Sequence, residues 1–178
     1  MWSITSRFGD QESFRQKPHT GIDFSMENGT QIPSIKQGII EKTVDYGNQN
    51  LGKGVFVKWE DGCTAIYGHL SKITVQEGQR VEQGDLLGYS GNTGFSTGAH
   101  LHFGLKKEGS FVDPSIYIND IQHMNELIAK KPSINDFLSS LSNIDWNNIN
   151  ANLIYIFSEM KCLLINHTVF AQYIQNFL

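Results

Sequence analysis

The sequence predicts a mainly β protein: an antiparallel β-sandwich or barrel-like domain followed by a small α-helical appendage at the C-terminal end. Residues up to about 118 are rich in glycine and in short β-type runs, whereas the remainder is dense in Asn, Ile, Leu and Phe. Short strands separated by frequent turn residues are typical of sandwiches and barrels. From about Ile116 the apolar residues instead recur every three or four positions, as in a helix. We therefore predict a β domain in residues 1–118 and a helical appendage in residues 119–178.

The β domain is predicted from segments that combine β-branched and aromatic residues with adjacent turn signals. The predicted strands are residues 35–46, 54–60, 63–70 and 100–106. Asp61-Gly62 joins the second of these to the third, and this dipeptide is a strong hairpin signal. Glu108-Gly109 is expected to turn the last strand. Glycine recurs at short intervals in residues 75–91, which predicts tight turns between very short strands.

The helical appendage is predicted from apolar residues at helical spacing. The first such stripe consists of Ile118, Ile121, Met124, Leu127 and Ile128, and Lys130, Lys131 and Pro132 end it. A second stripe consists of Leu153, Phe157, Met160, Leu164 and Thr168, and residues 169–177 are a third candidate. We expect these helices to pack on one another or on the β domain. The alternative is a surface that binds a protein partner or a second copy of the chain.

The composition is that of a globular protein and excludes several function classes. Of the 178 residues, 39% are hydrophobic and 18% are charged, which suffices for a buried core. The net charge of -4 and the lack of clustered Lys and Arg argue against a nucleic-acid partner. The first ten residues do not resemble a signal peptide, and no apolar run approaches the about 20 residues of a transmembrane helix. Cys63 and Cys162 form no CxxC pair, so we expect two small buried side chains and no thiolate zinc site.

Two histidines in the last predicted strand are the first candidates for chemistry. Side chains two residues apart in a strand point to the same face, so His100 and His102 lie side by side while Leu101 points to the core. One imidazole of such a pair can ligate a metal, and its neighbour can then take part in the reaction beside that metal. An isolated HxH is weak evidence, because two polar residues on a solvated face give the same pattern.

Two further motifs strengthen this signal. His19 and Asp23 lie four residues apart in HTGID, where Gly21 disfavours a helix, so both side chains share one face of an extended segment. His69 lies at the end of another predicted strand, in YGHL. Three protein ligands with one open position are the pattern of catalytic zinc. His19, Asp23 and one histidine of the pair supply that count, which leaves the other histidine and His69 beside the metal.

Competing motifs are less consistent with their surroundings. Residues 94–98 match the GxSxG nucleophile elbow, which requires a strand before it and a helix after it. Here turn residues precede the motif and a strand follows it, so we interpret it as a glycine-rich loop that leads into the His100–His102 strand. There is no HExxH motif. His123 and His167 lie on predicted helices without a second ligand at suitable spacing, and we interpret them as surface or core residues.

Taken together, these segments resemble the M23 family of zinc peptidases, which includes the lysostaphin and LytM type endopeptidases. The matching stretches are ITSRFG, HTGIDF, YGHL, the run from VQEGQ to HLHFGL, and VDPSIYI, in the family's order over residues 3 to about 118. The resemblance implies one Zn²⁺ per chain, with His19, Asp23 and His102 as ligands. It implies that His69 and His100 position and activate water and stabilise the tetrahedral intermediate. Ala99 and Gly104 depart from the family's usual Pro and acidic residue, and neither belongs to the ligand set.

The substrate implied by the resemblance is the peptide part of bacterial peptidoglycan, and the implied reaction is endopeptidase hydrolysis. Such an enzyme acts at the cell wall, in an extracellular, periplasmic or virion-associated setting. Because the chain as given shows no signal peptide, we expect a phage or prophage wall-degrading protein, or a domain of a longer exported protein. The candidate bonds are glycine cross-bridges, D-Ala cross-links to a diamino acid, and stem-peptide bonds.

Two other function classes remain as alternatives. The first is a non-catalytic relative that serves as a scaffold or activator of cell-wall machinery, but such relatives lack one or more ligands and this chain keeps all five polar positions. The second is a carrier of the biotinyl or lipoyl type, which the hairpin-rich segment GQRVEQGDLLG resembles. A carrier needs a lysine at a hairpin tip, and there is none between Lys72 and Lys106.

Overall fold

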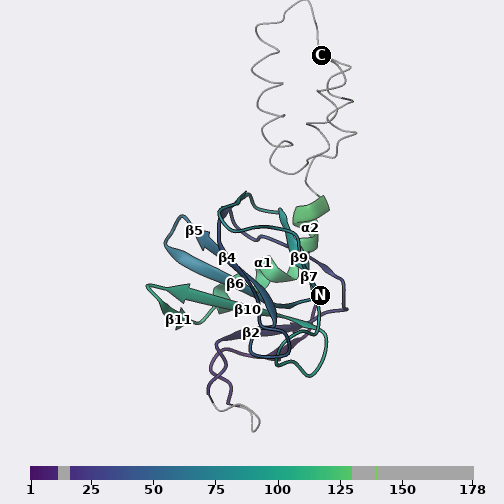
Figure 1. The fold of residues 1–178 in the computed structure, drawn as a ribbon, viewed down its shortest axis with the longest axis vertical. Helices are drawn as coiled ribbons and strands as arrows, with labels where there is room; N and C mark the ends of the chain where they lie inside the picture. The colour runs from purple at the N-terminus through teal and green to yellow at the C-terminus, as the bar shows by residue number, and fades with distance from the viewer. Residues whose placement is uncertain (12–16, 130–138, 140–178) are drawn as a thin grey trace, which may run out of the picture. The chain divides into compact units, whose positions relative to one another are not determined.

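The computed structural model describes residues 1–11, residues 17–129 and Ser139. The chain divides into two compact units, residues 1–129 and residues 130–178, and the elements labelled in Figure 1 all belong to the first. The second and third predicted helical stripes, together with Cys162 and His167, lie outside the described residues. The roles that we predict for residues 1–118 and 119–178 stay predictions.

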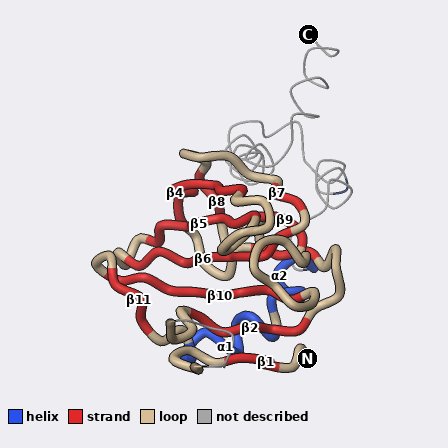
Figure 2. The backbone as a smooth tube through the Cα atoms, turned by 60° about the horizontal axis from the view of Figure 1, so that its bottom comes forward, coloured by secondary structure: helices blue, strands red, loops and turns tan. Residues whose placement is uncertain are grey.

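One large antiparallel sheet forms the main layer of the first unit. Its strands are β1 (Ile4–Ser6), β2 (Gly21–Ser25), β4 (Gly38–Asp45), β5 (Lys53–Trp59), β6 (Cys63–Leu70), β8 (Arg80–Val81), β10 (His100–Lys107) and β11 (Ser110–Val112). They lie in the order β1-β2-β10-β6-β5-β4-β8, with β11 paired to β10 (Figure 2). The predicted antiparallel β fold is therefore confirmed, and segments far apart in the sequence meet in the middle of the sheet.

Both predicted hairpin turns are present. Residues on either side of Asp61-Gly62 form the β5–β6 hairpin, in which Gly62 has a φ of 84° and Asp61 Oδ1 accepts a hydrogen bond from the Cys63 N–H. Glu108 and Gly109 connect β10 to β11 with φ values of 50° and 81°. Positive φ at both central residues matches the right-handed twist of the strands they join. Cys63 is buried, as expected.

A smaller sheet packs on the same hydrophobic core. It consists of β3 (Gln31–Pro33), β7 (Lys72–Ile73) and β9 (Leu86–Tyr89), in the order β3-β9-β7. Ile32 and Leu87 of this sheet belong to one buried cluster with Phe24, Tyr67 and Phe103 of the large sheet. The two sheets therefore bury their apolar faces against each other, which is the arrangement expected of a sandwich.

The first predicted helical stripe folds as a helical segment that contributes to this core. A 3₁₀ turn η1 (Ser115–Tyr117) leads into α1 (Ile118–Gln122) and α2 (Met124–Ala129), which His123 separates. Ile121 and Met124 are fully buried among residues of the sheets. These helices lie within the compact unit that ends at residue 129.

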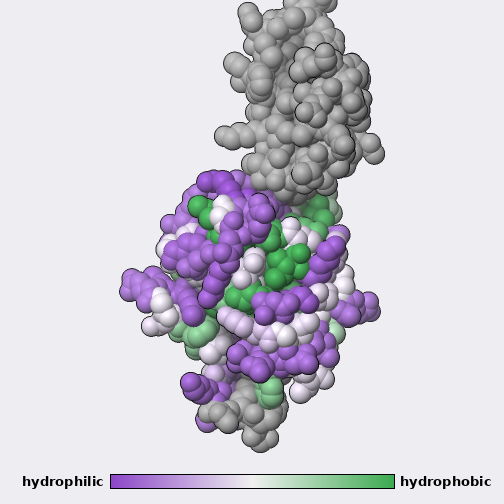
Figure 3. Space-filling model, in the orientation of Figure 1, coloured by the Kyte–Doolittle hydropathy of each residue, from purple (hydrophilic) through white to green (hydrophobic). Residues whose placement is uncertain are grey.

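The surface of the described unit is largely polar. On the face shown in Figure 3, hydrophilic residues surround a limited area of hydrophobic ones. None of the helices in the described part of the chain is both long and apolar enough to cross a membrane.

We predict that Ile121→Ala lowers the free energy of unfolding by about 2–5 kcal/mol, because it leaves a cavity in the core that the helices share with the sheets. Urea unfolding of the full chain measures the change. Ile116→Ala is the matched control, since this side chain is 77% exposed and its loss is expected to matter by no more than about 0.5 kcal/mol. Equal effects of the two substitutions would show that the helical segment does not contribute to the core.

Candidate metal centre

The pairing of β2 with β10 brings the first two motifs together. Asp23 lies directly opposite His102 in this antiparallel pair, and His100 lies opposite Ser25. Leu101 and Phe103 point to the other face, where both are buried in the core. The alternation predicted for the HLH strand is therefore present, with the two imidazoles on the face that Asp23 also occupies.

Three side-chain atoms converge at this point. The distances are 3.0 Å from His19 Nε2 to His102 Nδ1, 3.1 Å from His19 Nε2 to Asp23 Oδ1, and 2.9 Å from His102 Nδ1 to Asp23 Oδ1. Donors bound to a tetrahedral zinc ion at roughly 2.0–2.1 Å lie about 3.3 Å apart. The observed triangle is only slightly smaller, so the two nitrogens and the oxygen fit one small cation.

The surroundings keep these groups in forms that can bind a metal. His19 Nδ1 lies 3.0 Å from the carbonyl oxygen of Arg7, which can only accept, so Nδ1 carries the proton and Nε2 presents its lone pair to the cluster. Burial raises the pKa of Asp23, but the electrostatic influence of the adjacent His102 and His19 outweighs this and holds that pKa well below its usual range. Burial lowers the pKa of His102. A carboxylate and neutral imidazoles are the states in which these side chains coordinate metals.

Gly21 is needed in HTGID because the His102 ring occupies the space beside it. A Cβ at this position would lie 2.7 and 2.8 Å from two atoms of the His102 imidazole and 2.4 Å from the carbonyl oxygen of Phe103. Real Cβ contacts are not this short, so a side chain would displace either the ring or the strand. The glycine thus permits His19 and Asp23 to flank the imidazole of the neighbouring strand.

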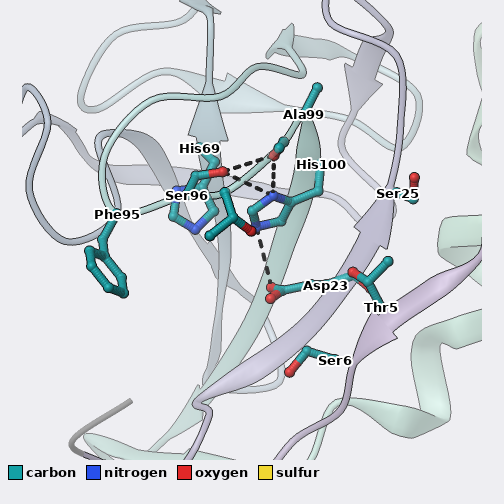
Figure 4. A pocket seen from close by; sticks show the side chains of 11 residues that line it. Thr5, Ser6, Asp23, Ser25, His69, Phe95, Ser96, Ala99 and His100 are labelled. Atoms are coloured by element: carbon teal, nitrogen blue, oxygen red, sulfur yellow. Dashed lines mark hydrogen bonds and ion pairs between the residues drawn. The ribbon is translucent and has the colours of Figure 1, made fainter. Parts of the chain in front are cut away.

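His69 and His100 lie beside the three converging atoms without joining them. Their ring centroids are 4.5 Å apart, and His100 Nε2 is 3.7 Å from Asp23 Oδ1 (Figure 4). His69 has a φ of 60°, a backbone conformation that is uncommon for residues other than glycine. Burial, together with repulsion from His100 and His102, lowers the pKa of His69 to about 4. This imidazole is therefore neutral at pH 7.

A pocket of about 310 Å³ opens onto these groups. Its walls are lined by Thr5, Ser6, Asp23, Ser25, His69, Phe95, Ser96, Thr97, Gly98, Ala99 and His100. Apart from Asp23, His69 and His100, the lining residues are uncharged and all but Phe95 are small. In Figure 4 the Phe95 ring lies apart from the two imidazoles. The pocket thus exposes Asp23, His69 and His100 among mostly small side chains.

The structure brings together all five residues singled out in the β domain, and His123 lies apart from them. His123 is exposed and its Nδ1 pairs with the carbonyl of Asn119, away from the cluster. The GxSxG segment is a loop that leads into β10, as predicted, and not an elbow between a strand and a helix. Two residues of this loop region were missed, namely Thr93 and Ser96, which contact His69 and His100. Their only sequence signal is their place in a glycine-rich segment just before the HLH motif.

Residues 17–114, more than half of the chain, match peptidase family M23. The chain belongs to this family. It is 32% identical over 148 residues to the peptidoglycan DD-endopeptidase ShyA of Vibrio cholerae, covering 78% of this chain and 34% of ShyA. It spans about a third or less of the length of the first curated relatives that it matches.

Two solved structures share the fold. The catalytic domain of the prophage-encoded M23 protein EnpA of Enterococcus faecalis has a TM-score of 0.59 and 33% identity, over 66% of this chain and 92% of that one. A zinc-containing peptidase from Vibrio cholerae has a TM-score of 0.57 and 30% identity, over 63% of this chain and 36% of that one. The family resemblance found in the sequence is thus confirmed.

We predict that the chelator-treated protein loses stability as the pH falls from about 6.5 to about 4. Because the pKa of His69 is lower in the folded protein than in the unfolded chain, the unfolded chain binds more protons in this window. The loss of stability is at most about 3–4 kcal/mol and is complete once the pH is below the pKa of His69 in the folded protein. Urea unfolding at several pH values measures it.

The control for this pH dependence compares two histidine variants. His69→Asn should flatten the slope, whereas His123→Asn, which changes an exposed histidine, should leave it as in the wild type. A slope that is unaffected by His69→Asn would mean that His69 is not held neutral by burial.

Proposed function

We propose that this chain is a zinc-dependent endopeptidase that hydrolyses peptide bonds in bacterial peptidoglycan. The observation that carries the proposal is the convergence of His19 Nε2, Asp23 Oδ1 and His102 Nδ1 within 3.1 Å of one another, next to two further imidazoles and a pocket. Membership of peptidase family M23 supports the reaction class. A site of this composition would be an unusual arrangement for a purely structural surface.

The donor set favours zinc, with one ion per chain. Two imidazole nitrogens and one carboxylate oxygen form a three-ligand set of the kind that catalytic zinc sites use, with the fourth position left for water or substrate. The likeness to a zinc-containing peptidase of Vibrio cholerae supports the same metal. A bound Zn²⁺ would supply Lewis acidity, which makes water a stronger nucleophile at neutral pH and polarises the scissile carbonyl.

His69 and His100 would carry out the proton transfers. Both line the pocket, and their rings lie side by side next to Asp23. The low pKa of His69 keeps its imidazole neutral at pH 7, the state that can accept a proton from an attacking water. Two adjacent imidazoles can divide the work: one accepts the proton from water, and the other, when protonated, donates a hydrogen bond to the negative charge that develops on the carbonyl oxygen.

The proposed substrate is the peptide portion of peptidoglycan. The relation to ShyA, which is named a peptidoglycan DD-endopeptidase, supports this class. The pocket lining is consistent with it, because Thr, Ser, Gly and Ala side chains leave room for small residues on either side of a bond. Glycine cross-bridges, D-Ala cross-links to a diamino acid and stem-peptide bonds are the candidates that product analysis would separate.

The substrate's location sets where the protein would act. Peptidoglycan lies outside the cytoplasmic membrane, so we propose action at the cell wall, in an extracellular, periplasmic or virion-associated setting. The likeness to a prophage-encoded protein supports a phage or prophage origin. Within the chain, the first unit carries the proposed chemistry, and residues 130–178 are the candidate region for a protein partner or oligomer contact.

We predict that the wild-type protein releases new amino groups from purified peptidoglycan and that two classes of variant lose this activity differently. His102→Ala should lose both the zinc and the activity, because one of three donors is removed. His69→Ala and His100→Ala should retain zinc and lose about 10²–10⁴-fold in kcat, the usual range for a lost acid–base group. Zinc content is measured by elemental mass spectrometry on the same samples.

Chelation and zinc add-back provide the control for these assays, because both should act on the wild type and not on His102→Ala. Mass spectrometry of the released fragments would name the bond. A zinc-loaded wild-type protein that is inert on several wall types would contradict the proposal and would favour a non-catalytic scaffold or activator.

We predict that Phe95→Ala raises KM by about threefold to tenfold with little change in kcat, because an aromatic rim contact contributes to binding and not to the reaction. Phe95 is 63% exposed at the edge of the pocket. Phe111→Ala is the matched control, since this ring is 41% exposed but lies on β11, beyond the other end of β10 from His100. Similar kinetics for both variants would argue against a substrate contact at Phe95.

A further inference from the structure

One loop, residues 91–99, contacts both histidines that are not among the three converging donors. We propose that Thr93 and Ser96 of this loop are positioning residues that hold the imidazoles of His69 and His100 with the proton on Nδ1 and the lone pair of Nε2 facing the pocket. The catalytic part of this inference rests on the proposed function, whereas the proton positions do not.

The two imidazoles have the same kind of partner. His69 Nδ1 lies 2.7 Å from the carbonyl oxygen of Thr93, and His100 Nδ1 lies 2.7 Å from the carbonyl oxygen of Gly98. A carbonyl oxygen can only accept, so both Nδ1 atoms must donate. In a neutral imidazole the other nitrogen then carries a lone pair and no proton. Both Nε2 atoms are thus prepared to accept a proton, the state that a general base requires.

The hydroxyl of Thr93 ties the loop to the strand end that carries His69. Its Oγ1–H donates to the carbonyl of Leu70 at 2.8 Å, and its Oγ1 accepts from the backbone N–H of Lys53 at 3.0 Å. Leu70 directly follows His69 in β6. The side chain of Thr93 therefore fixes its own carbonyl relative to the imidazole that this carbonyl orients.

The backbone around Thr93 is held from a second side. The Gly94 N–H donates to the Gly47 carbonyl at 3.0 Å, and the Phe95 N–H donates to the Asn50 carbonyl at 2.8 Å. Gly52 and Gly94 pack so closely that a Cβ on Gly52 would lie 2.4 Å from the Gly94 nitrogen. Residues 47–52 thus support the backbone next to Thr93 and fix the position of the Thr93 carbonyl.

Ser96 contacts His100 and the turn beside it, as Thr93 does for His69. Its Oγ lies 3.2 Å from His100 Nδ1, 2.6 Å from Asn92 Oδ1 and 2.8 Å from the carbonyl of Gly98. Its single proton can be donated to Asn92 or Gly98, which leaves lone pairs that accept from Nδ1–H. The Nδ1–H of His100 is thereby shared between Gly98 and Ser96, and Figure 4 shows Ser96 next to this ring. The hydroxyl closes the turn that carries the Gly98 carbonyl.

The test uses Thr93→Val and Ser96→Ala in the zinc-loaded full chain, with two readouts. Two-bond ¹H–¹⁵N NMR of the imidazoles reports which nitrogen is protonated. Wild type should show the Nδ1–H pattern for His69 and His100. Thr93→Val should move His69 toward the Nε2–H pattern and leave His100 unchanged. Ser96→Ala should move His100 toward the Nε2–H pattern and leave His69 unchanged.

Kinetics on peptidoglycan provide the second readout. Each variant should lose about 10–100-fold in kcat, the cost typical of removing a group that orients a site residue, with KM and zinc content unchanged. Thr93→Ser and Ser96→Thr retain the hydroxyl and should restore both readouts. Thr74→Val is the matched control, because the Thr74 hydroxyl also donates to a backbone carbonyl, that of Leu86, and Thr74 does not line the pocket.

The NMR readout separates this inference from the proposed function. If the protein is inert on cell walls but the two variants shift the tautomers as described, the positioning role stands and the peptidase proposal fails. If both variants keep the Nδ1–H pattern and the wild-type kcat, the positioning role is overturned. Should Thr93→Val fold poorly, Ser96→Ala decides the question alone, since Ser96 lies in a loop and is only partly buried.

Discussion

The register between β2 and β10 is the constraint on which the site depends. It places Asp23 opposite His102, and a slip of one residue would move one partner to the opposite face of the sheet. Ile22, Leu101 and Phe103 hold this register, because they occupy the buried face of the same two strands. The hydrophobic core therefore determines which polar atoms meet, and the converging donors are a consequence of packing on the other side of the sheet.

Much of the fold could be predicted because its signals are local. Strand alternation around Leu101 and the Asp61-Gly62 turn depend on neighbouring residues only, and both were identified correctly. The packing partners of the helical segment could not be obtained in this way. Helical spacing shows that Ile121 and Met124 share a face, but it does not show what that face packs against, and both side chains are buried with the sheets.

The sequence indicated the polar side chains that meet in the structure, but it did not indicate the backbone carbonyls that contact two of them. Residue types and spacing selected the five polar positions, whereas the choice of His102 over His100 as a ligand came from the family resemblance alone. In the structure His102 Nδ1 is 2.9 Å and His100 Nε2 is 3.7 Å from Asp23 Oδ1, and the ligand role of His102 stays a prediction. The acceptors of Thr93 and Gly98 are backbone carbonyls, which every residue type possesses, so the sequence carries no mark of them.

The contact between Gly52 and Gly94 bears on how such a site can diversify over evolution. Both glycines have positive φ, and a Cβ on either would collide with the backbone of the other, so neither position accepts replacement without separating the two loops. Phe95 follows immediately, and its side chain is 63% exposed. Sequence variation in this loop is therefore expected at the exposed neighbour, while the two glycines stay fixed and keep the two loops in contact.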